Sequence, residues 1–225
     1  MSELRLRYQR EGQRKGRHYD IDWPTNKPLL WAQIAPDPSL KATNSIGKRL
    51  IAANFPTGYQ VYFATRAEVD NNAVKSLLDS HGERFHEISE VQGKKTVGRN
   101  LFELMTFGRR VPIEISTLLA ATTHMGVIDA LLDSYESDRR NMFILPFMIA
   151  RTEPRGWVEK LGEFFKSGVR RRIDQNFVDD SRCIILTMWD HGFDFVSDKV
   201  THQELEQVAR QVATEANLQL STSEA

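Results

Sequence analysis

Two unbroken apolar runs constrain the fold more than any other feature of the chain. They occupy residues 142–150 and 183–189, and the segment between them carries apolar residues at helical spacing. Runs of this length are too short to span a bilayer and are typical of strands that are buried on both faces. The order strand, helix, strand therefore predicts a βαβ unit at the centre of a helix-covered sheet.

Strand and helix signals alternate along most of the remaining chain. Residues 29–34, 59–64 and 85–91 have the composition of strands, and a helix-like segment between the last two predicts a second βαβ unit. This alternation predicts an α/β fold with a mostly parallel or mixed central sheet of about five strands covered by helices. Residues 98–136 interrupt the alternation with consecutive helix-like segments, and we expect a helical insertion there.

Two short terminal segments flank the single α/β domain that we predict for residues 21–220. Residues 1–18 contain six basic residues and two acidic ones, so residues 1–20 are predicted to form a mobile basic arm. Such an arm is either a solvated tail or a segment that contacts phosphates or an acidic surface through Arg10, Arg14, Lys15 and Arg17. Residues 221–225 are expected to fray.

The overall charge and the single cysteine limit the class of protein. Thirty basic and thirty acidic residues give a formal net charge of zero at pH 7, so no global field attracts nucleic acid or an anionic membrane. Cys183 stands alone, which excludes an intramolecular disulfide and a zinc site built from several cysteines. Its place in an apolar run predicts a buried residue. We expect a cytoplasmic protein with no membrane partner, because neither a signal peptide nor a long apolar span is recognisable.

A basic cluster lies in the segment between the two apolar runs. Arg170, Arg171 and Arg172 follow Lys166 on a predicted helix, and Arg155 lies near the other end of the same helix. Guanidinium groups suit both phosphates and carboxylates, so this cluster is a candidate docking site for an acidic partner. The alternative is ordinary pairing with the aspartates that follow it in the sequence.

Two groups of acidic residues are candidates for catalysis. Asp79, Glu87 and Glu90, followed by Lys94 and Lys95, have the acid-then-lysine order of restriction-type nucleases, in which carboxylates hold Mg²⁺ and lysine stabilises developing charge. A glutamine stands, however, where the short acidic-x-lysine step of those enzymes needs its lysine. Solvated charges around a strand are the alternative interpretation.

The second group, Asp190, His191 and Asp194, follows the second apolar run, where α/β folds often place a site. Two carboxylates beside an imidazole would bind a metal or form an acid–base pair; the alternative is a polar turn. No phosphate-binding glycine motif is present in the sequence, and we expect no cofactor.

These observations favour a non-enzymatic interaction or regulatory protein. We expect it to bind the acidic surface of a partner and to modulate a larger protein assembly, as accessory or inhibitor factors of mobile genetic elements do. Nucleic-acid binding through the same basic groups is the first alternative, and a metal-dependent nuclease is the second. The sequence predicts no oligomeric state.

Overall fold

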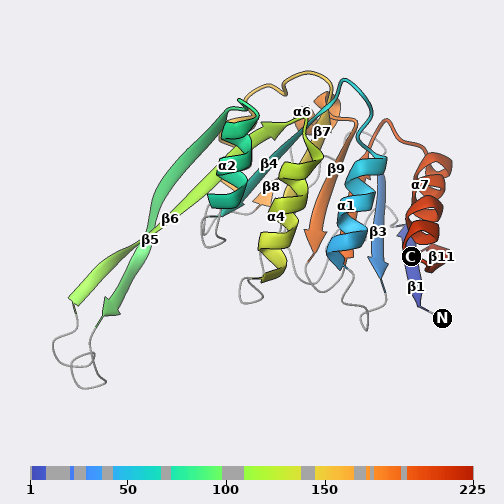
Figure 1. Cartoon of the computed structure of the whole chain (residues 1–225), viewed down its shortest axis with the longest axis horizontal. Coiled ribbons are helices and arrows are strands. Elements are labelled where there is room, and N and C mark those ends of the chain that lie inside the picture. The colour runs from blue at the N-terminus through green and yellow to red at the C-terminus, as the bar shows by residue number, and fades with distance from the viewer. Residues whose placement is uncertain are drawn as a thin grey trace.

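The computed structural model describes residues 2–8, 21–22, 29–36, 43–66, 72–97, 109–137, 145–164, 171–172, 175–188 and 192–224. A nine-stranded sheet with the order β11-β1-β3-β10-β9-β7-β4-β6-β5 forms its centre (Figure 1). The strands of this sheet are β1 (Glu3–Tyr8), β3 (Leu30–Pro36), β4 (Gln60–Arg66), β5 (Phe85–Val97), β6 (Arg109–Thr122), β7 (Pro146–Ala150), β9 (Cys183–Met188), β10 (Gly192–Ser197) and β11 (Gln219–Glu224). The predicted α/β class is confirmed, whereas the predicted number of about five strands is too small.

A second, two-stranded sheet and six helices complete the described residues. The small sheet pairs β2 (Ile21–Asp22) with β8 (Arg171–Arg172). The helices are α1 (Thr43–Ala53), α2 (Asn72–Ser80), α4 (Met125–Ser137), α5 (Trp157–Phe164), α6 (Gln175–Asp180) and α7 (His202–Glu215). None of these described helices has both the length and the hydropathy needed to cross a bilayer.

The large sheet is mixed, and most of its strand pairs are antiparallel. Only β1 and β11 pair in parallel among the described strands of this sheet. The two apolar runs form β7 and β9, as predicted, but these strands are direct antiparallel neighbours, so the parallel βαβ unit predicted there is wrong. An uninterrupted apolar run indicates that both faces of a strand are covered and carries no information on the direction of its neighbour.

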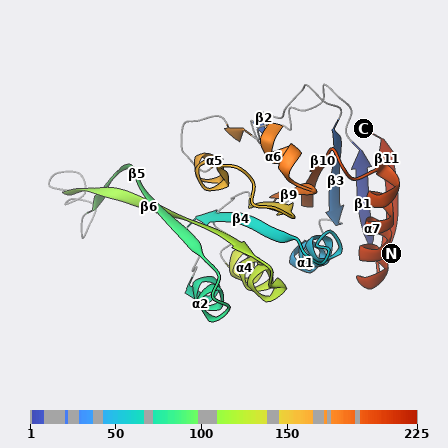
Figure 2. The same cartoon turned by 90° about the horizontal axis from the view of Figure 1, so that it is seen from above.

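Six consecutive elements, from β4 to β7, form two interleaved crossover units. β4 and β5 run parallel with β6 between them, and β6 and β7 run parallel with β4 between them. The crossover helices α2 and α4 lie side by side on one face of the sheet (Figure 2). The second predicted βαβ unit is therefore present in split form, within a ferredoxin-like βαββαβ arrangement.

Alternate residues of the strands face two separate cores. In β4, Val61 and Phe63 belong to the core under α1, α2, α4 and α7, whereas Tyr62 and Ala64 belong to the core under α5 and α6. Figure 2 shows these two helical layers on opposite faces of the sheet. Both faces of the central strands are thus buried, which explains the apolar runs.

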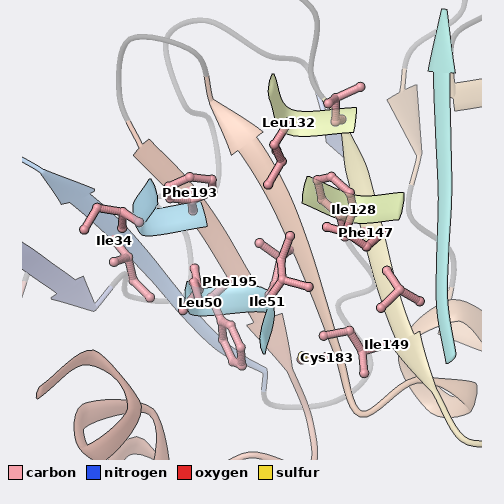
Figure 3. Close-up of a cluster of buried hydrophobic side chains, with 14 of the residues drawn as sticks. Ile34, Leu50, Ile51, Ile128, Leu132, Phe147, Ile149, Cys183, Phe193 and Phe195 are labelled. Atoms are coloured by element: carbon pink, nitrogen blue, oxygen red, sulfur yellow. The ribbon is translucent and has the colours of Figure 1, made fainter. Parts of the chain in front are cut away.

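The larger core is closely packed around α1. Leu50 and Ile51 of this helix lie with Phe147, Phe193 and other buried side chains of the sheet (Figure 3). Burial of each such side chain contributes about 1.5–3 kcal/mol relative to its exposure to water. Cys183 is completely buried in the same cluster, as its apolar run predicted, and burial raises the pKa of its thiol to about 12.

Both ends of the chain belong to the sheet, which corrects the predicted mobile arm and frayed C-terminus. Residues 3–8 form β1, between β3 and β11, and Leu4 and Leu6 are completely buried. Residues 219–224 form β11, whose only described strand partner is β1. The two terminal strands thus satisfy each other's backbone groups. Residues 9–20 lie outside the described residues.

The predicted helical insertion at residues 98–136 is also corrected. Residues 109–122 form β6, which lies between β4 and β5, and only α4 is a helix within the described part of that range. The end of β6 at Leu118 and Leu119 is buried on both faces of the sheet. Its apolar residues therefore belong to a buried strand, and residues 98–108 lie outside the described residues.

Candidate functional site

The two strands β5 and β6 extend beyond the body of the protein as a long ribbon, which we call the arm (Figures 1 and 2). β6 pairs with β4 only through residues 117–122, whereas its pairing with β5 continues to Arg109. Eight β5–β6 register pairs, from Ser89–Ser116 to Val97–Arg109, therefore have no third strand among the described residues. At about 3.3 Å per residue, these pairs span about 25 Å.

The charged residues of the arm are segregated along its length. The outer half consists of the pairs Lys94–Pro112, Lys95–Val111, Thr96–Arg110 and Val97–Arg109. The inner half consists of the pairs Ser89–Ser116, Glu90–Ile115, Val91–Glu114 and Gly93–Ile113. The four basic residues of the arm all belong to the outer half, and its two acidic residues belong to the inner half. In a chain of zero net charge, the register thus brings four basic residues together in four successive pairs.

A β-bulge lies within the inner half of the arm, one register pair before the outer half. The register shifts between Val91 and Gly93, so that Gln92 has no partner across the ribbon. Bulges increase the local twist of a strand and redirect the residues that follow. The bulge therefore sets the direction of the basic outer half relative to the acidic inner half.

The sequence-predicted basic cluster is not on one helix. α5 ends at Phe164, and Arg171 and Arg172 form β8, paired in parallel with β2. The predicted helix through these arginines is therefore wrong. Arg155 is exposed in the turn before α5, where its backbone N–H donates to Asp180 Oδ2 at 3.2 Å. The remaining predicted contact residues lie outside the described residues: Arg10, Arg14, Lys15, Arg17, Lys166 and Arg170.

The carboxylates of the nuclease hypothesis are distributed over two elements. Asp79 is exposed on α2. Glu87 on β5 accepts from Lys75 Nζ at 2.8 Å and from Ser116 Oγ at 3.0 Å, and these hydrogen bonds lower the pKa of its carboxyl group. Glu90 occupies the inner half of the arm. Within the described part of the chain, no group of three potential metal ligands comes together, and the nuclease remains an untested prediction.

Asp194 belongs to a strand, which corrects its predicted place in a turn. It lies in β10 opposite Gln33 of β3 and Leu186 of β9, and it is only 5% exposed. Burial raises the pKa of its carboxyl group to about 7. Asp190 and His191 lie outside the described residues, so the proposed metal or acid–base group of these residues is untested.

A pocket near the start of β5 contains aromatic residues whose polar atoms already have partners. The rings of Tyr62 and Trp157 meet edge to face with centroids 5.2 Å apart. Trp157 Nε1 donates to Glu153 at 3.2 Å, and the Tyr62 hydroxyl donates to Gln60 at 2.8 Å. Burial and the nearby Glu153 carboxylate raise the pKa of Tyr62 to about 12. The polar atoms of these two aromatic residues therefore have partners, whereas Glu83 Oε2, which belongs to another residue that lines the pocket, is buried without a hydrogen-bond partner among the described residues.

The residues that sequence reasoning missed are the four cations of the outer half. The sequence predicts a loop at Lys94 and Lys95, and Arg109 and Arg110 come directly after a predicted helix that stops at Gly108. A signal was present: Val111, Ile113 and Ile115 are β-branched residues at alternate positions, the pattern of a strand. Comparisons with protein families, curated proteins and solved structures found no significant match.

Proposed function

We propose that this chain is a non-enzymatic interaction protein that engages an anionic partner through the basic outer half of the arm. The observation that carries the proposal is the charge segregation along a ribbon that extends about 25 Å beyond its last supporting strand. A two-stranded ribbon is marginally stable by itself, so an arm of this length adds little to the stability of the body. The arm is not needed to stabilise the fold, and contact with a partner would explain why it is present.

Protection of strand edges is a simpler explanation for the charges, but it does not explain their order. Lysine, proline and bulges all protect an exposed edge against pairing with another chain, and Lys94, Pro112 and the bulge at Gln92 serve that purpose. Lysine is the charged residue most used for this protection, but protection does not require acidic residues to be kept apart from it. The separation of Glu90 and Glu114 from the cations is therefore not required for protection, whereas a partner-binding end requires like charges to gather.

Retention on immobilised heparin at pH 7.5 and low salt tests the proposal with a generic polyanion. A protein of net charge zero is retained only if its cations are clustered. The variant Lys94→Gln/Lys95→Gln is compared with Arg151→Gln/Arg210→Gln, which removes two exposed cations from the body and has the same net charge. We expect the arm variant to elute at lower salt than both the body variant and the unmodified protein. Equal elution of the two variants would refute docking through the arm.

The sequence led us to expect that this protein binds a larger protein assembly. We propose that the anionic surface contacted by the arm belongs to that assembly. The cytoplasmic location expected from the single cysteine remains a prediction.

A further inference from the structure

The strand β11 forms one edge of the large sheet and lacks the features that usually protect such an edge (Figure 1). Lysine, proline and bulges are the common means of protection. Residues 219–223 contain no charged residue and no proline, and the register of β11 against β1 is uninterrupted. The strand at the opposite edge, β5, does contain a bulge. An unprotected edge of this kind can add another strand.

The backbone of β11 is arranged to accept such a strand. The Gln219 N–H donates to the carbonyl oxygen of Ser2 at 3.1 Å, and the backbone groups of alternate residues point to the same side of a strand. The N–H and C=O groups of Leu220 and Thr222 therefore point away from β1, where no described strand lies. An antiparallel pair exchanges hydrogen bonds only between residues whose backbone groups face each other, so a second β11 fits with Thr222 on the two-fold axis.

The helix α7 lies over this edge and runs antiparallel to β11. It contacts both β1 and β11, and Figure 2 shows α7 and β11 together at the end of the molecule opposite the arm. Tyr8, the register partner of Glu224, donates its hydroxyl hydrogen to the His202 carbonyl oxygen at 3.1 Å, at the start of α7. At about 3.3 Å per strand residue and about 1.5 Å per helix residue, the part of α7 that lies level with Thr222 is about position 207.

At this level, the side of α7 that faces away from α1 carries one charge of each sign. Glu215 pairs with Arg49 of α1 at 2.7 Å, which identifies the side of α7 that faces α1. Glu206 precedes Glu215 by nine residues, or about two and a half turns, and therefore lies on the opposite side of the helix. It pairs with Arg210 at 2.5 Å, and the Arg210 side chain is 66% exposed. About a two-fold axis, Glu206 of each copy faces Arg210 of the other, so this surface is complementary to itself.

We propose that the chain forms a two-fold symmetric homodimer in which β11 pairs antiparallel with β11 of a second copy. Glu206 and Arg210 then form ion pairs between the two α7 helices. The backbone groups of the strands supply affinity, and the charges favour a second copy over an unrelated strand. The two sheets join into one, and the two arms lie at its opposite ends. This inference does not depend on the function proposed for the arm.

Sedimentation velocity over roughly 1 to 200 µM protein tests the strand pairing. We expect the unmodified chain to shift from monomer to dimer within this range. Thr222→Pro removes an N–H that points away from β1, and proline is tolerated on an edge strand at such a position. We expect this variant to raise the dissociation constant of the dimer at least about tenfold. Thr222→Ser keeps the N–H and should dimerise as the unmodified chain does.

A mixing experiment tests the ion pairs and the identity of the partner. Glu206→Lys and Arg210→Glu each place like charges opposite each other across the axis, so each variant alone should dimerise about tenfold more weakly or worse. In a mixture of the two variants, every contact across the axis again joins opposite charges. We therefore expect the mixture to form a heterodimer about as readily as the unmodified chain forms its homodimer.

Three outcomes would overturn the proposal. A chain that is monomeric at every concentration leaves this edge to an extended segment of another protein. A dimer that Thr222→Pro does not weaken is formed through a different surface. Charge reversals that leave dimerisation unchanged, or that form no heterodimer when mixed, exclude the two-fold arrangement of α7. Thermal unfolding at about 1 µM verifies that each variant is folded. Because Arg210 is also changed in the control for the arm, heparin retention is compared in the Thr222→Pro background.

Discussion

Asp194 makes the stability of this protein depend on pH in a direction opposite to that of most carboxylates. Its side chain is 5% exposed in the middle of the sheet, and its register neighbours, Gln33 and Leu186, carry no charge. Burial raises the pKa of the carboxyl group from 3.8 to about 7 in the folded protein. The protonated form is therefore the one that the fold accommodates.

The sign and size of the effect follow from this shift. Well below pH 4 the carboxyl group is protonated in both the folded and the unfolded chain, so its ionisation does not change the free energy of unfolding. Between pH 4 and 7 it ionises in the unfolded chain only, so the free energy of unfolding decreases as pH rises. A shift of about three pKa units corresponds to an upper limit of about 4 kcal/mol, because each unit is worth about 1.36 kcal/mol.

Asp194→Asn isolates this contribution, because asparagine does not titrate. Urea unfolding of both proteins is followed by circular dichroism from pH 4 to pH 8. We expect the free energy of unfolding of the variant, relative to the unmodified protein, to rise by up to about 4 kcal/mol over this range. Other carboxylates cancel in the difference, and a packing defect would give an offset that does not change with pH. A difference that stays constant within about 1 kcal/mol would refute the reasoning.

The opposite sign is expected for Glu87, which provides an internal control. Hydrogen bonds from Lys75 and Ser116 lower the pKa of its carboxyl group. The ionised form is therefore favoured by folding, and its contribution is present above pH 4.5 and lost as pH falls through the lowered pKa. Glu87→Gln should destabilise the protein at neutral pH, and the difference should shrink on acidification.

Three further predictions concern packing and helix capping. Gly47→Ala should destabilise the fold by about 1–3 kcal/mol in urea unfolding, because a Cβ at Gly47 would lie 2.7 Å from Phe193 Cζ. Gly126→Ala, on a helix position with no atom within 4 Å of the added Cβ, should instead be neutral or stabilising by up to about 1 kcal/mol; a similar loss in both variants would contradict the packing argument. Thr201→Ala should cost about 1 kcal/mol, because Thr201 Oγ1 accepts from the Glu204 N–H at the start of α7, and Thr201→Ser should recover most of the loss.

The sequence predicted those parts of the fold that depend on local pattern. The apolar runs at β7 and β9 indicated strands covered on both faces. Strand direction could not be predicted in the same way. The direction of a strand relative to its neighbours depends on how the connections cross the sheet. These connections are determined by the packing of the whole chain and not by a local sequence pattern.

Two strands were missed although their pattern was present. In β1, Leu4 and Leu6 alternate with Arg5 and Arg7, but the density of charge suggested a solvated tail. β6 lies in the range for which helix-like segments were predicted, and the structure places its Pro112 in the part of the strand that has no third strand beside it among the described residues. Proline is tolerated at such a position because its missing N–H removes no hydrogen bond to a second neighbour. In both strands the alternation of apolar and polar residues was a better indicator of structure than the overall residue composition.

The arm was not predictable from sequence, because its cations come together only through register. Lys94 and Arg110 lie on either side of residues 98–108, and nothing in the local sequence aligns them. The alignment is set at the root of the ribbon, where Leu118 is completely buried in one core and Leu119 in the other. A slip of β6 by one residue would exchange these faces and place the wrong residue in each core. The buried root and the bulge at Gln92 together fix the pairing of the outer half, so the hydrophobic core of the body and one inserted residue specify where the four cations of the arm meet.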